Sequence, residues 1–248
     1  MNNSLYPMIF KRKSFHVFKN TGDEKITLEE LNDLLNAFKS FQPLVDNIRV
    51  ELKVEEKTGG VLGQEYCLAF YSEIKDHYLE NVGYLGEQLD LYCVSKNIGT
   101  LWFGMGKAEK KQWDHLDYVI KIAIKKIDDE TKFRKDMYSA KRKSLQEIWQ
   151  GDFYKSIGDI VRFAPSAINS QPWFVEANEH ELKVSRTNTI IPKIKYFNHI
   201  DMGIFNHIDM GIFLCFLDLC LNHENISFSR TLYKDEYLYK VGEKHVDK

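Results

Sequence analysis

The segment from Ala164 to Trp173 concentrates polar side chains suited to binding a flat heterocyclic ring. It reads APSAINSQPW, and its two prolines restrict the backbone of a polar turn between an expected helix and an expected strand. Ser166, Asn169 and Gln171 offer a hydroxyl and two amides, which can bind the alternating donors and acceptors of a ring edge. By composition alone, the alternative interpretation is an ordinary capped turn without a ligand.

A basic tetrapeptide, KRKS, lies at residues 11–14 near the start of the chain. The Arg12 guanidinium can donate two hydrogen bonds to phosphate oxygens, and the Ser14 hydroxyl can donate another. Lys132 and Arg134 form a second basic pair just beyond an expected strand. For each of these residues the alternative is a solvated surface charge.

The tetrapeptide recurs at residues 141–144, and similar segments follow both copies in the same order. The most extensive correspondence is between residues 81–97 and 206–222, which align without a gap and pair Gly86 with Gly211. We therefore expect two homologous halves. Two unrelated stretches of similar pattern are the alternative. The halves would comprise residues 1–136 and 137–248.

Local patterns predict the elements that position these motifs. Thr27 and Glu30 form a capping box that opens a helix through Phe38, with leucines on one face. The two aligned segments of the repeat predict long helices. The other expected elements are strands at 66–71, 119–124, 174–177 and 182–184, a helix at 153–164, and a charged helical connector near residues 128–142.

The octapeptide FNHIDMGI occurs at residues 197–204 and again, identically, at 205–212. Eight residues of α-helix turn through roughly 800°, so two copies on one helix would present their side chains about 80° apart. We expect the second copy to continue into the long helix and the first to lie upstream without contributing chemistry. Copying alone explains the spacing of the acidic and histidine side chains, so no metal site is predicted for His199, Asp201, His207 and Asp209.

Composition excludes several classes of protein. The chain has 248 residues, 34 basic and 36 acidic side chains and a net charge of -2, so no overall field attracts nucleic acid or an anionic membrane. The four cysteines form no CxxC pair, and we expect reduced, mostly buried thiols. The longest apolar stretch, at residues 212–217, is too short to span a bilayer, so a cytoplasmic protein is expected. No dinucleotide-binding, P-loop, GxSxG or HExxH motif occurs.

The turn APSAINSQPW closely resembles the characteristic turn of nitroreductase-family flavoproteins. Arg12-Lys13-Ser14 resembles the N-terminal phosphate-binding motif of that family, and Asn97 to Gly104 resembles the helix-ending loop whose backbone contacts the flavin ring. The fused halves are most similar to the TM nitroreductase subgroup, in which one chain imitates the usual homodimer. The resemblance implies an α+β fold, with mixed or antiparallel sheets covered by helices and two halves that form a pseudo-dimer within one chain.

The resemblance also implies one FMN per chain, because each half keeps only part of the site. The N-terminal half holds the phosphate motif and the loop, and the C-terminal half holds the turn. Arg12 would anchor the phosphate, its repeat counterpart Arg142 would be dispensable, and His16 replaces the basic residue common in relatives. The implied FMN-binding residues are Arg12, Lys13, Ser14, His16, Gly99, Thr100, Leu101, Trp102, Lys132, Arg134, Pro165, Ser166, Ala167, Asn169 and Gln171.

The activity implied by the resemblance is an FMN-dependent oxidoreductase that passes a hydride from NAD(P)H through flavin N5 to an electrophilic acceptor. A nitroaromatic or a quinone would be such an acceptor, and the flavin itself would supply the chemistry without a catalytic side chain. Leu101 and Trp102 are expected to contact the ring near N5 through their backbone. The alternatives are a protein that stores or senses flavin with little turnover, and a scaffold without a cofactor.

Overall fold

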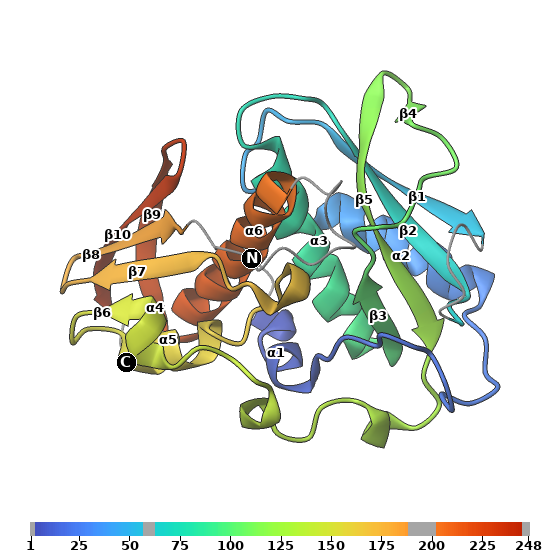
Figure 1. The fold of residues 1–248 in the computed structure, drawn as a ribbon, viewed down its shortest axis with the longest axis horizontal. Helices are drawn as coiled ribbons and strands as arrows, with labels where there is room; N and C mark the ends of the chain where they lie inside the picture. Colours follow the sequence, from blue (N-terminus) through green and yellow to red (C-terminus); the bar gives the residue numbers. More distant parts are fainter. Residues whose placement is uncertain (1–2, 57–62, 188–201, 245–248) are drawn as a thin grey trace.

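The computed structural model describes residues 3–56, 63–187 and 202–244 and contains two five-stranded sheets (Figure 1). The first sheet is antiparallel throughout and has the strand order β1-β2-β5-β3, with β4 paired to β5. Strand β3 is therefore an edge strand, and the far end of β5 carries the short strand β4. These strands are β1 (Val50–Glu56), β2 (Tyr66–Ser72), β3 (Ile98–Trp102), β4 (Gln112–Trp113) and β5 (Leu116–Lys126).

The second sheet has the order β6-β7-β8-β10-β9 and is antiparallel except for the parallel pair β6 and β7. All strands of the first sheet precede residue 137 in the sequence, and all strands of the second follow it. The protein is thus a mixed α+β structure, as expected. The strands are β6 (Trp149–Gln150), β7 (Trp173–Ala177), β8 (Glu181–Arg186), β9 (Ile226–Leu232) and β10 (Glu236–Lys244).

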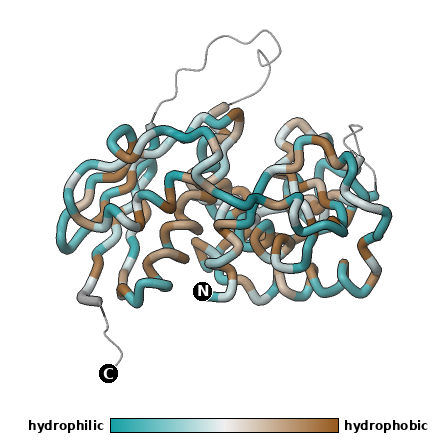
Figure 2. The backbone as a smooth tube through the Cα atoms, turned by 90° about the horizontal axis from the view of Figure 1, so that it is seen from below, coloured by the Kyte–Doolittle hydropathy of each residue, from teal (hydrophilic) through white to brown (hydrophobic). Residues whose placement is uncertain are grey.

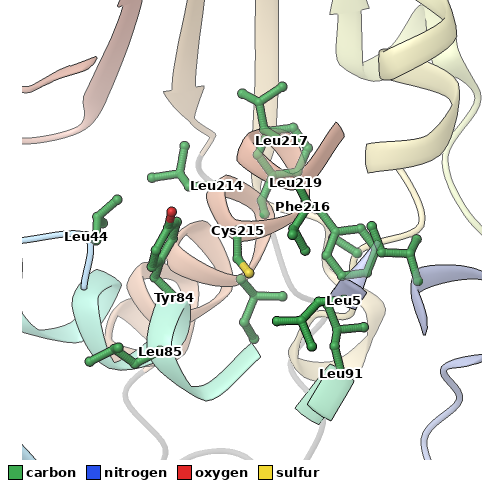
Figure 3. Packing of buried hydrophobic residues seen from close by; sticks show 14 of the residues in the cluster. Leu5, Leu44, Tyr84, Leu85, Leu91, Leu214, Cys215, Phe216, Leu217 and Leu219 are labelled. Atoms are coloured by element: carbon green, nitrogen blue, oxygen red, sulfur yellow. The ribbon is translucent and has the colours of Figure 1, made fainter. Parts of the chain in front are cut away.

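Two long helices, α3 (Tyr78–Ser95) and α6 (Met202–His223), lie together between the two sheets (Figure 1). Their side chains form the centre of the largest hydrophobic cluster, in which Tyr84 of α3 lies near Leu214 and Cys215 of α6 (Figure 3). Hydrophobic segments lie mainly inside the molecule, whereas the outer loops are largely hydrophilic (Figure 2). The two sheets are therefore joined by one continuous core.

Four shorter helices complete the described fold. Thr27 accepts a hydrogen bond from the Glu30 backbone, and the Glu30 side chain accepts one from the Thr27 backbone, so the predicted capping box of α2 is confirmed. The long helices are confirmed as well, although α3 begins three residues before residue 81 and α6 four residues before residue 206. The four are α1 (Met8–Lys11), α2 (Leu28–Ser40), α4 (Leu145–Ile148) and α5 (Lys155–Val161).

Two expectations about local structure were wrong. The segment at residues 128–142 contains only the short 3₁₀ turns at Glu130–Lys132 and Met137–Ser139, because aspartates at their N-termini accept local backbone hydrogen bonds that favour turns. Most of the expected loop from Asn97 to Gly104 is strand β3, because Ile98 to Trp102 pair in register with β5.

Helix α6 carries the most apolar part of the chain. Among the described helices it alone is long and apolar enough to cross a membrane, a length that the apolar stretch at 212–217 did not reveal. Most of its apolar span is buried inside the protein, as in a core helix, so no membrane span is indicated. All four cysteines are buried and free, as expected.

A buried carboxylate in the first turn of α3 joins the two halves of the molecule. Glu80 accepts a hydrogen bond of 2.8 Å from the Tyr237 hydroxyl and lies 2.7 Å from Nδ1 of His207. His77 lies 3.6 Å from the same oxygen. Burial alone would raise the pKa of Glu80, but its hydrogen bonds to His207 and His77 outweigh that effect and lower the pKa to about 2.

Substituting Glu80 by glutamine is expected to remove part of the acid sensitivity of folding. The folded pKa of about 2 lies below the ordinary value of 4.5, so the stabilisation is complete above pH 4.5 and is lost as the pH falls toward 2. The shift corresponds to roughly 3 kcal/mol. Urea unfolding at pH 7, 4.5 and 3 should therefore show a smaller loss of stability on acidification in the variant than in the wild type. The exposed control Glu56→Gln should lose stability as the wild type does.

Candidate functional site

A cavity of about 370 Å³ lies where residues of the two halves meet. The N-terminal half contributes Ser14, His16 and the end of β3 with the residues after it. The C-terminal half contributes the turn after α5 and one face of α6. We call it the interface cavity. It is lined by Ser14, His16, Leu101, Trp102, Phe103, Gly104, Met105, Ile120, Pro165, Ser166, Ala167, Ile168, Met202, Phe205, Ile208, Asp209 and Ile212.

The predicted polar turn forms one wall of this cavity in a strained conformation. Ile168, Asn169 and Gln171 have φ values of 48°, 59° and 49°, which place three non-glycine residues in the left-handed region. This conformation is least favourable for the β-branched Ile168, which also lines the cavity. Strain of this kind persists only where surrounding contacts hold it, and it concentrates at functional sites.

The polar side chains of the turn are used to hold neighbouring backbone segments. Gln171 accepts a hydrogen bond of 2.8 Å from the Lys143 backbone, and Asn169 accepts one of 2.8 Å from the Arg142 guanidinium. The Ser166 hydroxyl accepts one of 2.9 Å from the Gln171 backbone. Asn169 and Gln171 do not line the cavity, and their side chains fix the second KRKS segment against the turn.

Strand β3 positions the opposite wall. Phe15 donates a backbone hydrogen bond of 2.9 Å to the Thr100 carbonyl, and Phe103 donates one of 2.8 Å to the Lys121 carbonyl on the other side of the strand. Because strand residues alternate between their two edges, the backbone of Trp102 points outward with that of Thr100, whereas that of Leu101 points toward β5. The backbone of Trp102 is therefore directed away from β5, and both expected backbone contacts with the ring remain predictions.

The predicted glycine and threonine of this strand have internal roles. A Cβ atom added to Gly99 would lie 2.8 Å from Ile127 Cδ1 and 2.9 Å from the Phe15 ring, so core side chains fill that space. Thr100 is fully buried, and its hydroxyl donates a hydrogen bond to Asp90. Neither residue lines the cavity.

Arg12 is paired with acidic side chains of α3. Its Nε donates a hydrogen bond of 2.8 Å to Asp90 and lies 3.4 Å from Glu87, and the guanidinium is almost fully buried. Burial opposes its charge, but Asp90 and Glu87 outweigh that effect and raise the pKa of Arg12. Trp102 donates to both carboxylates, at 3.1 and 3.2 Å, which links the cavity wall to this buried group.

Further cationic side chains gather beside Arg12 near the Ser14 end of the cavity. Arg12 Nη2 donates a hydrogen bond of 3.3 Å to Ser14. The Lys13 ammonium donates to the Lys132 carbonyl, and the pKa of Lys13 is lowered by burial and by the charges of Lys132 and Arg134. Burial and the charge of Arg12 lower the pKa of Arg134 to about 10. We call Arg12, Lys13, Lys132, Arg134 and Arg142 the basic cluster.

Arg142 is the member of the basic cluster that has a buried donor atom without a partner in the described structure. Its Nη atoms donate to Asn169 and to backbone carbonyls, but its Nε is buried and has no partner in the described structure. Burial and then the charges of Arg12, Arg134 and Arg162 lower its pKa to about 10. Neither Arg134 nor Arg142 forms an ion pair within the described ranges. An anion bound here would reduce the repulsion between the guanidinium groups and accept a hydrogen bond from the Arg142 Nε.

Seven predicted site residues line the interface cavity: Ser14, His16, Leu101, Trp102, Pro165, Ser166 and Ala167. The residues of the basic cluster do not line it, and neither do Gly99, Thr100, Asn169 and Gln171. Sequence reasoning missed the α6 wall, which includes Phe205, Ile208 and Asp209. Helix α6 is apolar almost all round, so its sequence does not indicate which face meets a cavity. No metal site was predicted for His199, Asp201, His207 and Asp209. Of these four residues, His199 and Asp201 lie outside the described residues.

These features define an α+β protein in which two sheets enclose a helix pair and a largely apolar interface cavity adjoins a basic cluster. Residues 4–220 match a family model described as "Putative TM nitroreductase". The chain belongs to this family, which indicates an oxidoreductase. The family resemblance expected from the turn and the KRKS motif is thereby confirmed at this level.

A solved structure shares the fold. The crystal structure of a protein described as a "putative nitroreductase" from Thermotoga maritima superposes with a TM-score of 0.64 at 17% sequence identity. The alignment covers 97% of this chain and 94% of that one. No match was found among curated proteins.

Proposed function

We propose that the chain binds FMN in the interface cavity and uses it as an NAD(P)H oxidoreductase that reduces an electrophilic acceptor such as a nitroaromatic or a quinone. FMN would supply the hydride chemistry at its N5 atom. The observation that carries the proposal is a pair of half-buried guanidinium groups, Arg134 and Arg142, that have no ion-pair partner in the described ranges and lie near a cavity between the halves. A phosphate group would provide the negatively charged partner that these two guanidinium groups lack.

Residues at one end of the site would bind the phosphate, and residues at the other end would bind the ring. Arg134 and Arg142 would neutralise the phosphate, and the Ser14 hydroxyl would donate a further hydrogen bond. Apolar side chains of β3 and α6 would exclude water from the ring, and the outward-facing backbone of Trp102 would orient it. Arg12, which already has acidic partners, would contribute charge rather than a free donor set.

The proposed pseudo-dimer is supported by the packing of the two long helices. In the gapless alignment of the repeat, Gly83 corresponds to Ile208, and an added Cβ at Gly83 would lie 2.1 Å from the Ile208 carbonyl oxygen. A residue that packs on its own counterpart is the arrangement produced by a two-fold axis. We therefore propose residues 1–136 and 137–248 as the two halves of one functional unit.

Flavin content provides the direct test. The purified protein, saturated with FMN and freed of excess, is expected to release about one FMN per chain on denaturation, because in the described ranges the basic cluster lies beside one cavity between the halves. Release of FAD from protein as purified would overturn the phosphate assignment, and two FMN per chain would overturn the pseudo-dimer. NAD(P)H oxidation that rises with added quinone or nitroaromatic would support turnover over flavin storage.

A further inference from the structure

The proposed function leaves unused one carboxyl group in the wall of the interface cavity. Asp209 lies on α6, is 3% exposed and lines the cavity. Its two oxygens accept hydrogen bonds of 3.1 and 3.0 Å from the Ala167 backbone, and the Ser170 hydroxyl lies 3.4 Å from one of them. The carboxyl therefore lies between the strained turn and the space available to a ligand.

No positive charge compensates Asp209 in the part of the chain that the structure describes. Burial raises its pKa to about 8, against the opposing effect of its hydrogen bonds to Ala167 and Ser170. At neutral pH the carboxyl consequently holds a proton. A neutral carboxyl can accept from the Ala167 backbone and still donate one O–H hydrogen bond.

Most charged side chains on the elements packed against α6 are ion-paired, whereas Glu181 of β8 has no ion pair in the described ranges. His16 is the other titratable side chain that lines the cavity. The remaining pairs are Glu80 with His207, Glu87 and Asp90 with Arg12, Asp159 with Arg162, Asp218 with Arg230, Lys183 with Glu236, and Arg186 with Asp235.

We propose that Asp209 is a specificity-determining residue of the interface cavity, and that it donates a carboxyl O–H hydrogen bond to an acceptor oxygen of the bound ring. The other α6 side chains lining the cavity are apolar: Met202, Phe205, Ile208 and Ile212. A ring carbonyl or nitro oxygen that faces α6 therefore meets no other side-chain donor of that helix. The inference rests on the proposed function, because it takes a flavin or a ring-shaped electron acceptor as the ligand.

The test compares riboflavin and FMN affinity between pH 7 and pH 9 by quenching of flavin fluorescence. In the wild type, riboflavin affinity should fall about tenfold as Asp209 ionises, since the carboxylate cannot donate. Asp209→Asn keeps the shape and a donor, so its affinity should stay constant over this range. Asp209→Ala should bind severalfold more weakly than Asp209→Asn at pH 7, with circular dichroism confirming that both variants are folded.

The outcomes separate the two proposals. Flavin binding with a flat pH profile in the wild type would overturn the assignment of Asp209 alone, as would an equal fall in affinity in Asp209→Asn. Failure of the wild type to bind either flavin at pH 7 would overturn the proposed function, and the role of Asp209 with it.

Discussion

Replacing Arg142 with alanine is expected to weaken FMN binding by about 10- to 100-fold while changing riboflavin affinity by less than about threefold. A hydrogen bond to a charged group contributes roughly 1.5–3 kcal/mol, and Arg142 has a buried Nε without a partner. Riboflavin lacks the phosphate, so its affinity should not depend on Arg142. Fluorescence titration of both flavins measures the difference, and Arg134→Ala should behave in the same way.

Arg162→Ala is the matched control. Arg162 contributes to the repulsion around Arg142, but its own Nε donates a hydrogen bond of 2.8 Å to Asp159, so it has less need of an anion. Its removal should change FMN affinity by less than about threefold. If Arg162→Ala and Arg142→Ala lower FMN affinity equally, the effect is one of general charge, and the local assignment to Arg142 is incorrect.

Arg12→Ala should instead destabilise the fold. It would leave the Asp90 carboxylate buried without its cation, a change that typically costs about 3–5 kcal/mol. The family resemblance predicted Arg12 and not Arg142 as the phosphate anchor, because it assigned the phosphate motif to the N-terminal half. That motif does not reveal Asp90 and Glu87, which contact Arg12 from helix α3, about 80 residues away in the sequence. Unchanged stability of Arg12→Ala together with lost FMN affinity would restore Arg12 as the phosphate anchor.

Local signals predicted the regular elements well. Each of these elements is determined by residues within its own segment. The capping box at Thr27 starts helix α2, the β-prone run at Tyr66 forms a strand, and the aligned long segments form helices with an apolar face. The turn from Pro165 to Gln171 was also predicted to contribute to the site, and its first residues do line the cavity. These features depend on neighbours in sequence, which a single chain displays.

Features set by tertiary contacts were not predictable in this way. Ile98 to Trp102 form a strand because they pair with β5, which is distant in the sequence. Gln171 bonds to the Lys143 backbone because the second KRKS segment packs against the turn. Asp209 carried no signal of its own, since an identical octapeptide occurs just upstream and the surrounding helix is apolar on all sides. The buried environment of Asp209 results from the packing of α6 against the turn, which the sequence does not show.

Gly211→Ala is expected to destabilise the protein by at least about 3 kcal/mol, which for a chain of this size lowers the melting temperature by roughly 10 °C. An added Cβ would lie 1.9 Å from the Glu80 carbonyl oxygen and 2.8 Å from the Tyr84 backbone nitrogen. Both are backbone atoms of a helix, so α3 and α6 would have to separate along the central cluster. Thermal unfolding followed by circular dichroism measures the effect.

The direction of this change distinguishes packing from helix propensity. In an exposed helix, glycine to alanine stabilises by about 1 kcal/mol, so propensity alone predicts a higher melting temperature for Gly211→Ala. At Gly242 the nearest atom to an added Cβ is the Ser227 hydroxyl, at 2.4 Å, and that side chain can rotate away. Gly242→Ala should therefore cost less than about 1 kcal/mol. Because the cavity wall that includes Ile208 and Asp209 is carried by α6, only Gly211→Ala should also weaken flavin binding. A Gly211→Ala protein that melts at or above the wild-type temperature would contradict the direct backbone contact between the two helices.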